Sequence, residues 1–175
     1  MVNGRQPILR PDLNSSLLPR KDMRALVAYV DGGSDGNPGP SGIGVVIEGA
    51  AAGTIRISRP IGGQDSNVAE YVALMEALRY AISVKAKQLH IYSDSEVVVK
   101  QMIGEYKCCS PKLYSLNWTC KKLARSLSFS LSYVARKQNA EANALAHLAI
   151  TRIKDNAATC LGGEHSRTAT RKQPQ

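Results

Sequence analysis

Residues 25–40 read ALVAYVDGGSDGNPGP, an apolar run that ends at a carboxylate and leads into a loop rich in glycine and proline. The run from Ala25 to Val30 is rich in Val and Tyr, as buried β-strands are, and Asp31-Gly-Gly has the composition of a turn. We therefore predict a strand that ends at Asp31 and carries this carboxylate to one edge of a sheet.

The loop after Asp31 is open to several interpretations. A phosphate-binding P-loop is excluded because no Lys-Ser or Lys-Thr follows the glycines. An EF-hand loop started at Asp31 would put Gly42 where the bidentate Glu belongs, so this class is excluded as well. A simple turn, in which Asp31 accepts hydrogen bonds from backbone amides, explains this stretch alone as well as a functional site does.

The rest of the chain alternates between strand and helix patterns. Strands clustered first and then alternating with helices predict an α/β fold, a mixed sheet flanked by helices. The apolar spacing of three and four residues after residue 67 is typical of an amphipathic helix, and Gly104 is expected to end a short one. The predicted strands are 25–30, 44–47, 54–58, 88–93 and 129–134, and the predicted helices are 68–84, 95–102, 111 to about 126 and 139 to about 150.

Two further carboxylates lie close to the predicted boundaries between strands, loops and helices. Asp94 comes directly after an apolar strand, and if that strand is the parallel neighbour of the first one, Asp94 and Asp31 lie side by side. Two close carboxylates repel unless a cation compensates, so the pair favours metal binding. Helix capping is the alternative, by Asp94 or Ser95 at one helix. At the other helix, Asn67 and Glu70 form a plausible capping pair, and taken alone this is the simpler interpretation.

Length and charge indicate one domain with basic ends. The 175 residues suffice for a single buried core, and we expect residues 1–24 and 151–175 to be disordered tails around a domain at 25–150. Each tail carries five basic and two acidic groups, whereas residues 25–150 carry thirteen and ten. The net charge of +9 suits a polyanionic partner.

Cysteine spacing and hydropathy exclude other classes. The four cysteines form no C-x-x-C pair, so we expect free thiols rather than a zinc site. We find no apolar run of about 20 residues and no signal-peptide pattern. We therefore expect no membrane association and a cytoplasmic location.

The three carboxylates belong to motifs whose order and spacing resemble those of the ribonuclease H family, specifically its compact bacterial and archaeal type I branch. The resemblance covers about residues 26–149. It rests on Tyr-Val-Asp31-Gly-Gly with Gly-Asn37-Pro-Gly-Pro, Asn67-Val-Ala-Glu70-Tyr, Tyr-Ser-Asp94-Ser-Glu with Gln101 and Gly104-Glu-Tyr-Lys107, and Val134-Ala-Arg136 leading to Asn139-Ala-Glu-Ala-Asn143-Ala-Leu-Ala.

The resemblance implies a ribonuclease H-like five-stranded mixed sheet with the first strand central. It also implies an endoribonuclease that hydrolyses the RNA strand of RNA/DNA hybrids with two Mg²⁺ ions, for which Mn²⁺ would substitute. Asp31, Glu70 and Asp94 would bind the metal, and no organic cofactor would be needed. We expect the protein to be a monomer. By the same resemblance, the residues that contact the hybrid are Gly33, Ser34, Asn37, Ser66, Asn67, Ser95 and Arg136.

The sequence departs from the family pattern at the fourth acidic position, which is Asn143 here. We count Asn143 with the catalytic and metal-binding residues, although an amide oxygen brings no negative charge. Glu141 is a poor replacement because it lies about 200° around the helix. His147 lies one turn further on, and we expect it to be a surface residue. The alternative function is a catalytically weakened or inactive module that binds the hybrid.

Overall fold

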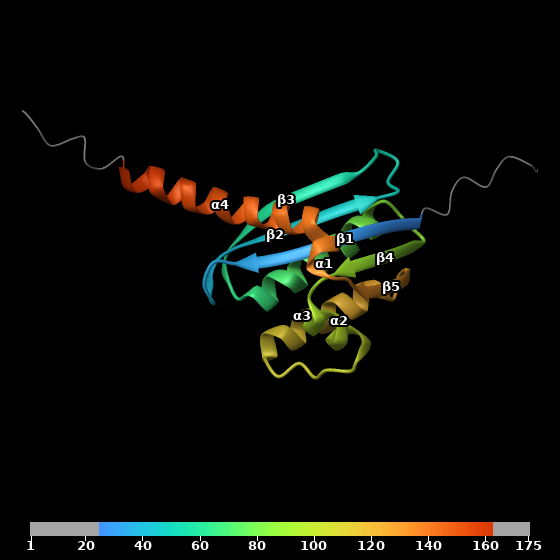
Figure 1. Cartoon of the computed structure of the whole chain (residues 1–175). Helices are drawn as coiled ribbons and strands as arrows, with labels where there is room; N and C mark the ends of the chain where they lie inside the picture. Colours follow the sequence, from blue (N-terminus) through green and yellow to red (C-terminus); the bar gives the residue numbers. More distant parts are fainter. Residues whose placement is uncertain (1–24, 163–175) are drawn as a thin grey trace, which may run out of the picture.

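The computed structural model describes residues 25–162. The predicted tail at 1–24 lies outside the described residues. Of the predicted tail at 151–175, residues 163–175 also lie outside them, whereas residues 151–162 are helical, so the prediction of disorder there was wrong. The described chain forms one five-stranded sheet in the order β3-β2-β1-β4-β5, with helices on both faces (Figure 1). The strands are β1 (Ala25–Ser34), β2 (Gly39–Glu48), β3 (Ile55–Gln64), β4 (Gln88–Ser93) and β5 (Ser128–Tyr133).

The central strand β1 makes the sheet mixed. It pairs antiparallel with β2 and parallel with β4, and β4 continues parallel to β5. The predicted mixed sheet with the first strand at its centre is therefore confirmed. The first three strands are the longest, ten residues each, and they form two consecutive antiparallel pairs joined by short connections.

β1 does not end at Asp31, and in this respect our prediction was wrong. The strand continues to Ser34, with Gly32 opposite Ile43 and Gly33 opposite Gly42 of β2. Glycine is required at position 32 because an added Cβ would lie 2.1 Å from the backbone carbon of Ala69. The two glycines thus act as strand residues that leave room for neighbouring elements, and the turn comes after Ser34.

Helices cover both faces of the sheet. They are α1 (Ser66–Ser83), α2 (Glu96–Ile103), α3 (Pro111–Ala124) and α4 (Ala140–Gly162), with the 3-10 turn η1 (Arg136–Asn139) before α4. Leu74 and Leu78 of α1 share the buried core with alternate residues of β1 and β2, such as Val30 and Val45. Gly44 of β2 points the other way, where an added Cβ would lie 1.9 Å from the carbonyl oxygen of Ala142 in α4.

Three helix boundaries differ from the sequence predictions. α1 is capped at Asp65 rather than at Asn67, and no side chain bonds its first turn as a cap. α4 begins after η1, so Asn139 is the last residue of that turn and does not start the helix. α4 also passes the predicted end near Ile150 and reaches Gly162, since no Gly or Pro interrupts residues 151–161. Figure 1 shows these last turns extending beyond the sheet.

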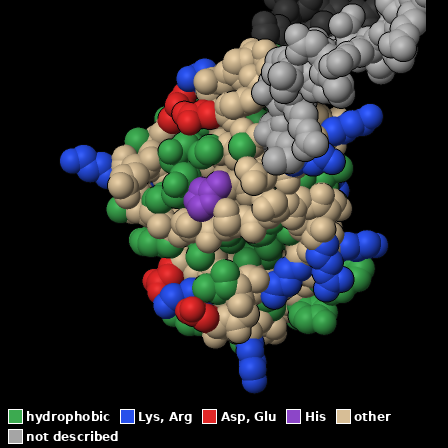
Figure 2. All heavy atoms as spheres, turned by 90° about the vertical axis from the view of Figure 1, so that its right-hand side faces the viewer, with side chains coloured by type: hydrophobic (Ala, Val, Ile, Leu, Met, Phe, Trp, Pro, Cys, Tyr) green, Lys and Arg blue, Asp and Glu red, His purple; other side chains and the backbone are tan. Residues whose placement is uncertain are grey.

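β2 and β3 are longer than the predicted strands 44–47 and 54–58, because they pair with each other from Gly39 opposite Gln64 to Ile47 opposite Ile55. The predicted cap and end of α2 agree with the structure. Ser95 caps α2, its hydroxyl accepting a hydrogen bond from the backbone nitrogen of Val98, and Gly104 ends that helix in the left-handed conformation (φ 91°). Cys108, Cys109 and Cys120 are free thiols. Among the described residues, we find no helix whose length and apolarity would suit a membrane span. At the end where β1 begins, Lys and Arg side chains are spread around the rim, with hydrophobic surface between them (Figure 2).

Candidate active site

Three carboxylates meet at the point where the parallel pairing of β1 with β4 ends. Val30 of β1 pairs with Ser93 of β4, so Asp31 and Asp94, each one residue further on, lie next to each other. Together with Glu70 of α1 they offer oxygen atoms that all lie within 4.8 Å of one another. The three side chains line a cavity of about 280 Å³, and we refer to them as the carboxylate cluster.

Glu70 reaches the cluster because α1 packs close to the glycine of β1. The backbone nitrogen of Gly32 donates a hydrogen bond to Oε2 of Glu70 over 3.2 Å. The absence of a side chain at position 32 permits this approach of helix and strand. The capping interpretation of Glu70 was therefore wrong, since its carboxylate is bound by β1.

The negative charges of the three carboxylates in the cluster repel one another. Burial raises the pKa of Asp31 to about 7, with a further contribution from the neighbouring charge of Asp94, although Arg136 acts in the opposite direction. The pKa of Glu70 is raised well above its usual value, first by burial and then by Asp31 and Asp94. A divalent cation would relieve this repulsion, and carboxylate oxygens are the hard ligands that such ions prefer. The residues present therefore fit a metal site.

Asn143 lies beside the cluster, as the sequence predicted. Its Nδ2 donates a hydrogen bond to Oδ2 of Asp31 over 3.0 Å. Glu141 faces elsewhere and pairs with Nε of Arg56 at 2.5 Å. The structure thus brings Asn143, and not Glu141, to the carboxylates, while the role of Asn143 as a metal ligand stays a prediction.

Sequence reasoning missed the part played by Asn139. This residue is only 1% exposed, and its Nδ2 donates to the carbonyl oxygen of Val30 over 2.8 Å and to Oδ1 of Asp94 over 2.7 Å. It ties the start of α4 to both central strands and fixes one oxygen of Asp94. No local pattern in the sequence indicates this role, because Asn139 lies in η1, before α4, and both of its partners are distant along the chain.

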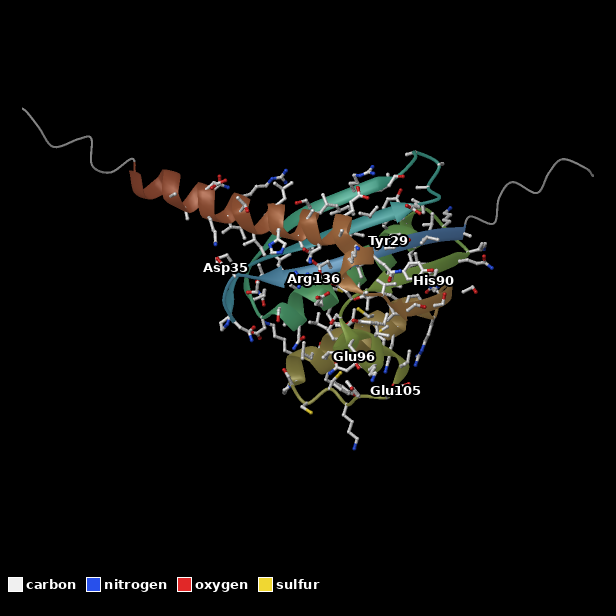
Figure 3. All side chains as sticks on the ribbon, viewed as in Figure 1. Tyr29, Asp35, His90, Glu96, Glu105 and Arg136 are labelled. Carbon is white, nitrogen blue, oxygen red and sulfur yellow. The ribbon has the colours of Figure 1, made fainter. Side chains whose placement is uncertain are left out.

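The residues predicted to contact nucleic acid divide into two groups. Gly33, Ser34, Ser66 and Arg136 line the same cavity as the cluster. The exposed Arg136, labelled in Figure 3, is the cationic side chain in that lining. The other three do not line it.

The three residues that do not line the cavity are Asn37, Asn67 and Ser95. Asn37 lies in the loop after β1, where its Oδ1 accepts from the backbone nitrogen of Ser66 over 3.3 Å. Asn67 is exposed in the first turn of α1, and the hydroxyl of Ser95 is engaged in capping α2. Contact with nucleic acid by these residues stays a prediction.

α4 forms one wall of the cavity, which sequence reasoning did not foresee. Ala146, His147 and Ile150 line it, so His147 is exposed, as expected, but it also faces the site. Further along α4, Lys154 pairs with Asp35 of the loop that follows β1. Figure 3 shows Asp35 at the end of the sheet that the extended helix crosses.

Comparisons with known proteins place this arrangement in a family. A family model described as "Reverse transcriptase-like" matches residues 29–149. The ribonuclease HI of Halobacterium salinarum is 32% identical over 152 residues, which cover 86% of this chain and 74% of that protein. The crystal structure of RNase H1 from this archaeon has a TM-score of 0.69, with 73% of this chain and 98% of that chain covered.

Two further relatives extend the comparison. A bifunctional protein of Mycobacterium tuberculosis is 35% identical over 136 residues, 76% of this chain, so the chain spans only 37% of that relative's length. LC11-RNase H1, solved in complex with an RNA/DNA hybrid, is 33% identical with a TM-score of 0.67, and the match covers 73% of this chain and 98% of that one. The extent of the family match and the identity to ribonuclease HI show that this chain belongs to the ribonuclease H family.

Proposed function

We propose that the protein is an endonuclease that hydrolyses the RNA strand of RNA/DNA hybrids with divalent metal ions. The observation that carries this proposal is the carboxylate cluster, three carboxylates whose oxygens lie within 4.8 Å of one another in an open cavity. Family membership supports the reaction class, and the hybrid bound by LC11-RNase H1 supports the substrate.

Mg²⁺ is the ion we expect, held by Asp31, Glu70 and Asp94. When bound, a pair of such ions would activate a water molecule and stabilise the negative charge of the leaving oxygen. The protein's own contribution is orientation. Gly32 holds Glu70 and Asn139 holds Asp94, each by a hydrogen bond, so two of the three ligands are fixed before any ion arrives.

The same cavity suits the RNA strand. Gly33 offers backbone without a side chain. The hydroxyl of Ser34 is held by the end of β3, because it donates to the carbonyl of Gln64 over 2.8 Å. Arg136 supplies a positive charge for a phosphate. We infer that the backbone of β1, with Ser66, follows the shallow minor groove, where 2′-hydroxyls distinguish RNA from DNA. The monomeric state and the cytoplasmic location stay predictions from the sequence.

Cleavage of matched duplexes tests the proposed function. The RNA strand of an RNA/DNA hybrid is labelled at one end and incubated with protein and Mg²⁺, beside RNA/RNA and DNA/DNA duplexes of the same sequence. We expect internal cuts in the hybrid alone. A folded protein that leaves the hybrid intact at every Mg²⁺ and Mn²⁺ concentration would refute the proposal.

A second candidate is a module that binds the hybrid without cutting it. The observation in its favour is that Asn143 presents an amide donor to Asp31, where a fourth anionic ligand would strengthen metal binding. Hybrid binding without turnover, and turnover in Asn143→Asp, would support this alternative. Turnover by the unchanged chain would exclude it.

A further inference from the structure

One wall of the cavity that holds the carboxylate cluster continues beyond the cavity itself. Ala146 and Ile150 of α4 line the cavity, and Lys154 lies one further turn along the same helical face. Lys154 comes eleven residues after Asn143, which corresponds to about 16 Å along the helix at about 1.5 Å per residue. It therefore lies away from the cluster, but in line with the wall beside it.

The loop that follows β1 holds Lys154 at the rim of this cavity. The ammonium of Lys154 pairs with Oδ2 of Asp35, and the neighbouring Ser34 lines the cavity. Figure 3 labels Asp35 at that end of the sheet. The backbone nitrogen of Asp35 donates to the carbonyl of Pro40 over 2.9 Å, so the loop is closed by its own backbone. A contact between distant segments thus places one positive charge beside residues of the cavity.

The cavity is short of positive charge for a polyanion. Its lining includes the three carboxylates of the cluster, and among the described residues Arg136 is the one Lys or Arg in it. Metal ions on the carboxylates act at the phosphate that is cut, so other phosphates of the strand need cationic side chains to hold them. Arg136 lies just before α4 and Lys154 lies far along it, so the two cations stand on either side of the wall that α4 forms.

The ion pair between Lys154 and Asp35 is one that a phosphate can replace. The two side chains are 54% and 52% exposed, and ion pairs in such positions contribute little to stability. A lysine ammonium is a point charge on a flexible stem, so it can turn from a carboxylate to a phosphate without movement of the helix. We propose that Lys154 binds a backbone phosphate of the hybrid away from the one that is cut, and that Asp35 holds this side chain in place until the hybrid binds. The inference rests on the proposed function, from which it takes the hybrid as ligand.

The salt dependence of hybrid binding tests this contact. The affinities of the unchanged chain and of Lys154→Gln for a labelled RNA/DNA hybrid would be measured over a series of salt concentrations in EDTA, where no metal-dependent cleavage occurs. Loss of one phosphate contact lowers the slope of log affinity against log salt by about 0.9. We therefore expect Lys154→Gln to bind about eightfold more weakly at about 0.1 M salt and about twofold more weakly at about 0.5 M.

Lys87→Gln is the matched control. Lys87 is exposed and precedes Gln88, which pairs with Ala25 at the opposite end of β1 from the cavity. Its substitution removes the same charge from the protein, so it accounts for any general effect of net charge on the affinity. We expect Lys87→Gln to leave the salt slope unchanged.

Asp35→Asn separates a phosphate contact from a structural clamp. If Lys154 only anchored the loop, loss of Asp35 would weaken hybrid binding as loss of Lys154 does. A lysine that binds phosphate gives the opposite sign, because Asp35→Asn frees the ammonium and removes a negative charge. We expect Asp35→Asn to bind the hybrid several-fold more tightly, and the gain to be smaller in the Lys154→Gln background.

Three results would overturn the inference. They are equal salt slopes for Lys154→Gln and the unchanged chain, both shown to be folded by circular dichroism, weaker hybrid binding by Asp35→Asn, and no hybrid binding by the unchanged chain at any salt concentration. None of these results bears on cleavage. The proposed function fails only if the hybrid stays intact in Mg²⁺ and Mn²⁺, so the two failures are distinguishable.

Discussion

Asp31→Asn should make the metal-free protein more stable, although it removes a residue of the proposed active site. Asp31 is 5% exposed, and burial together with Asp94 raises its pKa from 3.8 to about 7. The folded state therefore disfavours the charged form of this carboxyl. Asparagine keeps the shape and an acceptor oxygen, but it carries no charge.

The size of the effect follows from the two pKa values. The folded state binds the proton more tightly than the unfolded state does, so stability is lost as pH rises from about 4 to about 7. Each pH unit in that window corresponds to about 1.4 kcal/mol, which gives on the order of 4 kcal/mol at pH 8. Structural relaxation and water entry reduce this free-energy cost, and we expect the unfolding free energy of the variant to be about 2–4 kcal/mol higher. For a domain of this size the gain would raise Tm by roughly 6–12 °C.

Denaturant unfolding in EDTA measures this gain. Asp31→Asn should exceed the unchanged protein in unfolding free energy at pH 8, and the difference should shrink at pH 5, where Asp31 is protonated when folded. Excess Mg²⁺ should also narrow the difference, because the ion stabilises only the intact cluster. Glu105→Gln, at an exposed carboxylate, should change stability by less than about 0.5 kcal/mol. A variant no more stable than the unchanged protein in EDTA at pH 8 would refute this reasoning.

Three other substitutions test the ligands and the strand glycines. Asn143→Asp should lower the Mg²⁺ concentration for half-maximal cleavage and reduce the ratio of Mn²⁺ to Mg²⁺ activity, because it adds an anionic ligand; superimposable metal titrations would show that the fourth position is irrelevant. Gly32→Ala should cost about 3 kcal/mol or more in thermal unfolding, since the new Cβ would lie 2.1 Å from backbone of Ala69. Gly33→Ala, whose nearest neighbour is the tip of Ile150 at 3.3 Å, should be much milder, and equal losses would contradict the packing argument.

The sequence was sufficient to predict the sheet and the cluster for a physical reason. Asp31 and Asp94 each follow an apolar run, and the parallel pairing of β1 with β4 places the residues after these two runs next to each other whatever the details of the loops. The motif order added Glu70, which no periodicity placed there. The alternative capping role of Glu70 was removed only by its hydrogen bond with Gly32.

The features that the sequence did not predict depend on contacts between distant segments. Gly32 and Gly33 look like turn residues until α1 and α4 are packed against them, and only then does their role in β1 appear. The two bonds of Asn139 join residues 109 and 45 positions away, beyond any local pattern. α4 passes its predicted end near residue 150 because a helix that leaves the sheet needs no apolar face to continue.

The most direct test of the central claim is cleavage of an RNA/DNA hybrid by Asp94→Asn in Mg²⁺, beside the unchanged chain. The variant keeps an oxygen to accept the hydrogen bond from Asn139, so its fold and its binding of the hybrid should persist. The account predicts that the unchanged chain cuts the RNA strand and that the variant binds the hybrid without cutting it. Cleavage by Asp94→Asn at the rate of the unchanged chain would contradict the assignment of the carboxylate cluster as the catalytic metal site.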